Sequence, residues 1–164
     1  MIVRSQTVHL KGPREQQQDE LLELQHKGDH FFAVIDGMGG ALAGREAAQK
    51  LKELLRQRLL SEPKNSKQLA ALLKGINEIF LAWVKAEYGD ELTEQEIPGA
   101  VMTVVRISRN RIDFAHLGDT RLYSFVGDEV ELQTTDQVDG EGAPVQCFGN
   151  PEIEPQHNSI QLFP

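Results

Sequence analysis

The chain has 164 residues, of which 40% are hydrophobic and 26% charged, so we expect one globular domain spanning residues 1–164. Its net charge of −8, without a basic stripe interleaved with aromatic residues, argues against a nucleic-acid partner. No stretch approaches a membrane-spanning helix, no apolar signal segment opens the chain, and Cys147 is the single cysteine. We therefore expect a cytoplasmic domain with no membrane partner and no internal disulfide.

The first half of the chain alternates between extended and helical patterns. Short apolar runs bounded by polar residues or glycine predict strands, whereas apolar residues spaced three and four apart predict amphipathic helices. We expect, in order, a strand at 4–10, a turn at Gly12-Pro13, a strand or helix at 20–25, a buried strand at 30–35, and helices at 43–60 and 67–87 that are separated by Pro63.

The second half is dominated by strand patterns that follow an acidic loop at 89–98. We expect strands at 100–108, 111–117, 120–125, 130–134 and, at the end, 158–163, with a tight hairpin turn at Arg109-Asn110. Two strands, two helices and then a run of strands favour helices packed on an antiparallel sheet over a repeating βαβ pattern. The expected fold class is therefore α+β.

The segment Asp36-Gly37-Met38-Gly39-Gly40, at the end of the buried strand, is the strongest local motif. An aspartate in this position holds its carboxylate on a stiff support, which suits Mg²⁺ or Mn²⁺, and the Gly37 carbonyl could approach the same ion. The alternative is a plain strand-to-helix turn in which Asp36 caps the helix and the glycines turn the chain. The motif alone leaves both interpretations open.

Two phosphate-binding interpretations of this stretch are excluded. Arg45 and Glu46 stand where a P-loop needs lysine and serine or threonine, so Glu46 would present a negative charge to the phosphates. Leu42 occupies the third glycine position of the dinucleotide-binding fingerprint.

Two further segments carry candidate site residues. In the first, Arg14 could grip a phosphate with its two-pronged guanidinium and Asp19 could orient a metal-bound water, although alone the segment fits a polar surface loop. In the second, Asp119 follows Gly118 between two apolar strands, a composition that is common in turns. His116 lies within a strand pattern, which favours a packed histidine over a metal ligand.

Taken together and in this order, the motifs resemble the type 2C, metal-dependent serine/threonine protein phosphatases, in the bacterial branch of that family. The resemblance rests on Gly12-x-Arg14 with Gln18-Asp19, Asp36-Gly37-Met38-Gly39-Gly40 with Gly44, Gly118-Asp119-Thr120-Arg121, and Thr134-Thr135-Asp136. It implies a four-layer αββα sandwich, in which antiparallel sheets are flanked by helices and which this chain would leave incomplete at the C-terminus.

The resemblance also implies a metal centre. Asp36 would bridge two Mn²⁺ or Mg²⁺ ions, and Gly37 would offer its carbonyl to one of them. Asp19 would bind metal-coordinated water, Asp119 would help to hold a third, weaker ion, and Arg14 would hold the substrate phosphate. A water activated by the two ions would then hydrolyse phosphoserine or phosphothreonine in a protein substrate, in the pathway of a cognate serine/threonine kinase.

Some features depart from the family pattern. Gln18, which stands where an acidic or amide residue is usual, is acceptable, but Met38 replaces a histidine that some members use as a proposed general acid. Two further metal-binding aspartates of the family would lie beyond Pro164. The sequence therefore leaves open a second function, that of a catalytically inactive pseudophosphatase or regulatory binding module, and it also allows self-association through unpaired sheet edges.

Overall fold

The computed structural model describes residues 2–38, 41–61, 65–89, 92 and 97–162. In these residues two helices pack on an antiparallel sheet, which confirms the expected α+β class. The elements are, in chain order, β1 (Asp19–His26), β2 (Asp29–Met38), α1 (Ala41–Leu59), α2 (Ser66–Tyr88), β3 (Gly99–Ile107), β4 (Arg111–Leu117), β5 (Tyr123–Val126), β6 (Glu129–Leu132) and β7 (Gln156–Gln161).

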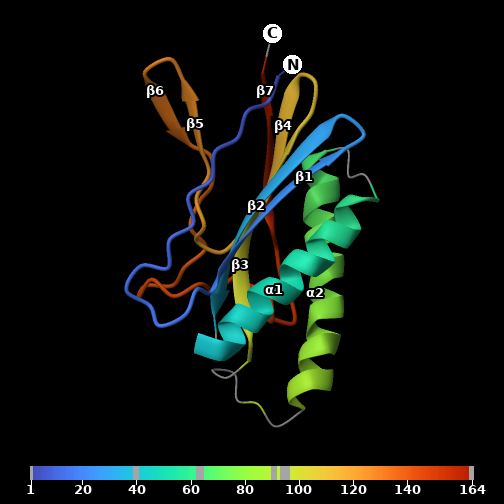
Figure 1. The fold of residues 1–164 in the computed structure, drawn as a ribbon, viewed down its shortest axis with the longest axis vertical. Helices are drawn as coiled ribbons and strands as arrows, with labels where there is room; N and C mark the ends of the chain where they lie inside the picture. The colour runs from blue at the N-terminus through green and yellow to red at the C-terminus, as the bar shows by residue number, and fades with distance from the viewer. Residues whose placement is uncertain (1, 39–40, 62–64, 90–91, 93–96, 163–164) are drawn as a thin grey trace.

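The main sheet has five strands in the order β1-β2-β3-β4-β7, and every neighbouring pair is antiparallel. Figure 1 shows α1 and α2 together on one side of this sheet, with the N-terminal segment and the separate β5–β6 hairpin on the other. The described residues thus form a helix layer on one sheet with a small hairpin beside it, an incomplete version of the expected sandwich.

The second helix carries clear start and stop signals. The Asn65 side chain accepts a hydrogen bond of 2.9 Å from the Gln68 amide at the N-terminus of α2. At the other end Gly89 has φ +82°, a conformation that glycine adopts without strain, and its amide donates to the Lys85 carbonyl. These caps set the bounds of α2 one residue beyond the expected helix at each end.

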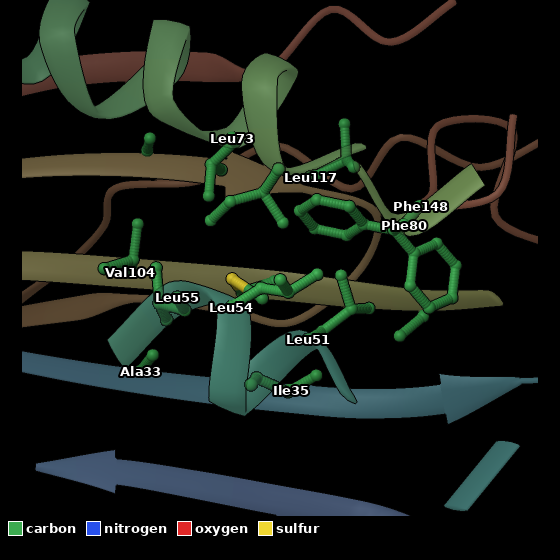
Figure 2. Packing of buried hydrophobic residues seen from close by; sticks show 14 of the residues in the cluster. Ala33, Ile35, Leu51, Leu54, Leu55, Leu73, Phe80, Val104, Leu117 and Phe148 are labelled. Carbon is green, nitrogen blue, oxygen red and sulfur yellow. The ribbon is translucent and has the colours of Figure 1, made fainter. Parts of the chain in front are cut away.

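The hydrophobic core lies between the helices and the sheet. Figure 2 shows leucines of α1 and both a leucine and a phenylalanine of α2 pointing toward apolar side chains of the strands. The labelled side chains are Leu51, Leu54, Leu55, Leu73, Phe80, Ala33, Ile35, Val104, Leu117 and Phe148. Because side chains alternate along a strand, the residues between these strand positions extend from the opposite face, which is where the candidate site lies.

A tight turn sets the register of the first strand pair. Lys27 and Gly28 both have positive φ, +48° and +88°, as in the type I′ turn that suits a two-residue hairpin. The turn places His26 opposite Asp29 and, at the far end of the pair, Asp19 opposite Asp36. The position of two candidate site residues is therefore fixed by a turn about eight residues away.

A buried charge cluster joins several strands at the other end of the sheet. The Asp113 carboxylate is fully buried, and it accepts hydrogen bonds from Arg106 Nη1 at 2.8 Å and from Ser159 Oγ at 2.6 Å. Arg106 also donates from Nε to Asp29 Oδ2 at 2.8 Å, and Arg111 Nε reaches Asp113 Oδ2 at 3.1 Å. The cluster links the start of β2 with β3, β4 and β7, and each buried charge has an opposite charge beside it.

The expected strand at 4–10 is wrong. This segment pairs with no strand in the described structure, and Val8 and Leu10 are 73% and 76% exposed. It is instead tied to β1 by separate contacts, from Ser5 Oγ to Glu23 Oε1 at 2.8 Å and from His9 Nε2 to the Asp19 carbonyl at 3.1 Å. Alternation alone makes no strand, because backbone groups also need a neighbouring strand with which to pair.

Other expected elements are confirmed with shifted bounds. The ambiguous segment at 20–25 is a strand, and the strand expected from 120 starts at Tyr123. The Leu122 carbonyl still accepts from the Gln133 amide in the register of the hairpin, but the Leu122 amide donates to the side chain of Thr134, at Oγ1, and so takes no part in a strand ladder. Gly39, Gly40, Pro63 and Phe163 lie outside the described residues, as does most of the acidic loop.

Candidate functional site

A pocket of about 650 Å³ opens where β1 and β2 meet the loop that follows β4. Its lining includes all the site residues that the sequence predicts, namely Arg14, Asp19, Asp36, Gly37 and Asp119. It also includes Lys11, Met38, Val101 and Pro144, which the sequence did not single out as site residues. The structure therefore brings together candidates that lie more than one hundred positions apart in the chain.

Asp19 and Asp36 form the acidic centre of this pocket. They are direct partners in the β1–β2 register, which places their side chains on the same face about 5 Å apart at Cβ. Burial raises the pKa of the Asp36 carboxyl to about 6, helped by the charge of Asp19, a hydrogen bond with Asp19 and the charge of Asp119. The positive charge of Arg14 therefore does not offset the burial and the neighbouring carboxylates that disfavour the ionised form of Asp36.

Gly37 packs so closely that no side chain fits there. A Cβ on this residue would lie 1.9 Å from the Gly44 carbonyl oxygen of α1 and 2.9 Å from the Gln18 carbonyl oxygen. The Gly37 amide donates to the same Gln18 carbonyl at 3.2 Å. The glycine after Asp36 therefore lets the start of α1 and the residue just before β1 pack closely on the end of β2, which explains Gly44 as part of the motif.

Arg14 supplies a positive charge to the lining of the pocket. It lies in the loop that follows Gly12, whose φ of +63° belongs to the turn expected at Gly12-Pro13. Arg14 is exposed, and its charge lowers the pKa of Asp36, against the larger effects that raise it. An exposed guanidinium beside paired carboxylates can bind an anion that approaches from solvent.

Asp119 reaches the pocket from the loop after β4. Gly118, with φ +100°, lies so close to β3 that a Cβ there would be 2.1 Å from Val101 Cγ1. Val101 is itself the β3 partner of Asp36. The Gly118-Asp119 turn is therefore packed directly on the strand beside Asp36, and the charge of Asp119 contributes to the raised Asp36 pKa.

Asp136 does not line the pocket. The Arg121 guanidinium instead makes bidentate hydrogen bonds to the Asp136 carboxylate, from Nε to Oδ1 at 3.0 Å and from Nη2 to Oδ2 at 2.5 Å. This contact lowers the pKa of Asp136. The two segments Gly118-Asp119-Thr120-Arg121 and Thr134-Thr135-Asp136 are thus structural partners of each other, which the sequence did not predict.

Cys147 and His116 are both buried in the structure. Burial raises the pKa of the Cys147 thiol, which disfavours the reactive thiolate. Burial lowers the pKa of His116, so the ring is neutral at physiological pH. Its Nδ1 lies 2.9 Å from Thr103 Oγ1, a contact that the pattern of an apolar strand did not reveal. The threonine at 103, within the otherwise apolar start of β3, was the one sign in the sequence that His116 has a polar partner.

The donor set fits part of a divalent-metal site. Carboxylate oxygens suit Mg²⁺ and Mn²⁺, and a cation between Asp19 and Asp36 would relieve the repulsion that raises the Asp36 pKa. Within the described ranges, however, no group of three or more His, Cys, Asp or Glu side chains is arranged to hold an ion.

The described helices include none long and apolar enough to cross a bilayer.

Comparison with known proteins identifies the family. The family model for protein phosphatase 2C matches residues 4–137. The serine/threonine protein phosphatase PstP of Mycobacterium tuberculosis is 26% identical over 136 residues, which are 77% of this chain and 26% of PstP. The chain therefore spans only 26% of the length of that relative.

Solved structures show the same fold. The catalytic domain of PstP in complex with two manganese ions has a TM-score of 0.71 at 24% identity, over 92% of this chain and 68% of that one. Stp1 from Staphylococcus aureus has a TM-score of 0.73 at 18% identity, over 92% of this chain and 68% of that one. With the family model matching most of its residues, the chain belongs to the protein phosphatase 2C family.

Proposed function

We propose that this chain carries part of a metal-dependent phosphatase that hydrolyses phosphoserine and phosphothreonine in proteins. The observation that supports it most is the direct pairing of Asp19 with Asp36 at a pocket that Arg14 and Asp119 also line, in a chain of this family. No covalent phosphoenzyme is needed for such hydrolysis, and the buried Cys147 is poorly placed to form one.

Each residue has a role in this proposal. Asp36, Asp19 and the Gly37 carbonyl would hold Mn²⁺ or Mg²⁺, and Asp119 would help to hold a further, weaker ion. Bound divalent ions supply Lewis-acid charge and lower the pKa of water at such a site. A related structure, that of PstP, is described in complex with two manganese ions. The carboxylates of this chain would thus provide some of the ligands that such chemistry needs.

Arg14 would bind the substrate phosphate at the mouth of the pocket. Its guanidinium can make two parallel hydrogen bonds to phosphate oxygens, which would orient the phosphoryl group toward the acidic centre. Met38 lines the same pocket and has no proton to exchange. The serine or threonine oxygen that leaves would therefore take its proton from water or from another group of the site.

The test is release of phosphate from a phosphothreonine peptide by the 164-residue chain in Mn²⁺, with EDTA as the control. Activity should require the metal and should be lost in Asp36→Asn. Asp128→Asn, an exposed aspartate outside the pocket, is the matched control and should keep full activity. Activity that persists in EDTA, or in Asp36→Asn, would contradict the metal-dependent assignment.

A catalytically inactive binding module is the second candidate. It is favoured by the lack of a three-ligand metal group in the described residues. A folded chain that shows no heat of Mn²⁺ binding by titration calorimetry and no phosphate release would support this function over hydrolysis.

The proposed partner is a phosphorylated protein, in the pathway of a serine/threonine kinase, and the proposed location is the cytoplasm. Self-association is a further possibility because β1 and β7 are the edge strands of the sheet. Sedimentation equilibrium over a range of concentrations tests it directly, since a single monomer mass throughout would exclude pairing of the edges.

A further inference from the structure

The loop that carries Asp119, residues 118–122, is fixed at both of its ends. The Gly118 amide donates to Gln137 Oε1 at 2.8 Å, and the Gly118 carbonyl accepts from the Gln137 amide at 2.8 Å. The Leu122 amide donates to Thr134 Oγ1 at 3.1 Å. These bonds join the loop to the segment that precedes and follows Asp136, but they leave its middle to be held in another way.

The middle of the loop is held by the sheet through Thr120. Thr103 Oγ1, on β3, donates to the Thr120 carbonyl at 3.2 Å and lies 2.7 Å from Thr120 Oγ1 in a second hydrogen bond. Because one hydroxyl contacts both the backbone and the side chain of Thr120, it fixes the position and also the orientation of that residue. Asp119 is the adjacent residue, so its backbone is held in place as well.

Thr103 is itself supported by His116. The imidazole Nδ1 lies 2.9 Å from Thr103 Oγ1, and the two residues are direct partners across β3 and β4. Thr103 is 5% exposed and His116 is fully buried. Polar groups at this depth are costly unless they are hydrogen-bonded, and a valine would fill the threonine position without that cost. The hydroxyl therefore has a use beyond packing of the strand.

Repulsion between carboxylates explains why the Asp119 loop needs the hydrogen bonds from Thr103. Asp119 shares its pocket with Asp19 and Asp36, and the three like charges repel one another. Without a counter-force, an aspartate on a surface loop would turn outward into solvent. The bonds from Thr103 to Thr120 act from beneath, on the sheet side of the loop, and they oppose that movement.

We infer that Thr103, supported by His116, is a positioning residue that holds the Asp119 loop against the repulsion of the other carboxylates and so keeps Asp119 directed into the pocket. The inference rests on the proposed function for its effect on metal binding. Its structural part, the ordering of the loop by the Thr103 hydroxyl, can be measured without any metal.

The first experiment follows amide hydrogen exchange by NMR in the full chain with EDTA present. Thr103→Val should speed exchange of the Gly118 and Leu122 amides about tenfold, the change expected for the loss of one ordinary hydrogen bond. Thr103→Ser keeps the hydroxyl and should restore the slow exchange. Amides within β2 serve as the internal control and should be unaffected.

The second experiment measures Mn²⁺ affinity by the loss of the free-ion EPR signal. Thr103→Val should weaken binding severalfold in the wild-type background and should have no further effect in Asp119→Asn, since it acts through Asp119. Equal losses in both backgrounds would overturn the inference, as would loop amides that are unchanged in Thr103→Val. A wild-type chain that binds no Mn²⁺ would contradict the proposed function, and loop exchange would still decide the positioning role.

If Thr103→Val fails to fold, Thr120→Val removes the partner hydroxyl from a half-exposed position outside the sheet. It should speed exchange at the same amides, and Thr120→Ser should restore it. Thr135→Val, at an exposed threonine on the neighbouring segment, is the matched control for both substitutions. Exchange as slow in Thr120→Val as in the wild type would overturn the inference.

Discussion

Asp19 lies directly opposite Asp36 across the β1–β2 strand pair, so the two carboxylates extend from one face of the sheet into the same pocket. Their separation is set by the sheet and not by flexible loops. In the absence of a cation this arrangement stores repulsion, and the first prediction follows from that.

Asp36→Asn should stabilise the metal-free chain at neutral pH. The pKa of Asp36 is raised from 3.8 to about 6, so the folded chain binds this proton more tightly than the unfolded chain does. Stability therefore falls as pH rises from about 4 to about 6 and stays lower above that. Because Asp36 is partly exposed, we expect a gain of only about 1 kcal/mol in Asp36→Asn.

Urea unfolding in EDTA at about pH 8 and at about pH 4 measures this effect. The advantage of Asp36→Asn should be present at the higher pH and absent at the lower one. Mn²⁺ should raise the unfolding midpoint of the wild type and leave that of Asp36→Asn unchanged. A variant that is less stable than the wild type in EDTA at the higher pH would contradict the electrostatic account.

Arg14→Ala should weaken binding of a phosphorylated substrate. Loss of a charged hydrogen bond is worth about 1.5–3 kcal/mol, which corresponds to about a tenfold or greater rise in KM. Steady-state kinetics on a phosphothreonine peptide provides the measurement, and the rise should be smaller for a small aryl phosphate. Arg109→Ala, another exposed arginine but outside this pocket, is the control. Unchanged KM for both substrates would remove Arg14 from the site.

Gly37→Ala and Gly75→Ala should change stability in opposite directions. A Cβ at Gly37 would collide with the Gly44 carbonyl oxygen at 1.9 Å, and backbone cannot move aside cheaply, so we expect a loss of about 3 kcal/mol or more. Gly75 lies inside α2 with open space around its Cα, so alanine there should add about 0.5–1 kcal/mol. Thermal unfolding measures both changes, with a lower midpoint than the wild type expected for Gly37→Ala and a higher one for Gly75→Ala. A tolerated alanine at 37 would show that the strand end can separate from α1.

Asp113→Ala should be among the most destabilising substitutions. It would leave Arg106 buried with one of its two carboxylate partners removed, and breaking a buried pair in this way costs about 3–5 kcal/mol. Urea unfolding measures the loss. Asp128→Ala, at an exposed position in the β5–β6 turn, should stay within about 0.5 kcal/mol of the wild type. A cost below about 1 kcal/mol at Asp113 would mean that water replaces the lost contacts.

Local patterns predicted the elements that are stabilised by local features. The apolar spacing of α1 and α2, the buried run of β2 and the β3–β4 hairpin all agree with the structure to within a few residues. The strand predicted at 4–10 is wrong because strand formation depends on a neighbouring strand, and no pattern within the segment indicates whether such a strand exists. The strand predicted from 120 does not include residues 120–122, because the Thr120 carbonyl and the Leu122 amide form hydrogen bonds with the side chains of Thr103 and Thr134.

Residue patterns predicted the candidate site only as separate motifs, and the resemblance to the family was what grouped them around one metal centre. No pattern directly indicated that Asp19 and Asp36 are opposed, although the Lys27-Gly28 turn between their strands could have indicated the register. The pairing of Arg121 with Asp136 and the Thr103–His116 contact join residues from different elements. Contacts of this kind depend on how the strands are stacked in space, which periodicity does not encode.

Val101 connects the two acidic motifs through apolar contact alone. It is paired with Asp36 on β2, and its Cγ1 occupies the space that a side chain at Gly118 would need. Enlarging residue 101 would push the following loop away, and any side chain at 118 would require residue 101 to shrink. Because φ +100° also disfavours any side chain at 118, we expect glycine to be kept there in the course of evolution and residue 101 to stay no larger than valine, although neither residue carries a group that reacts.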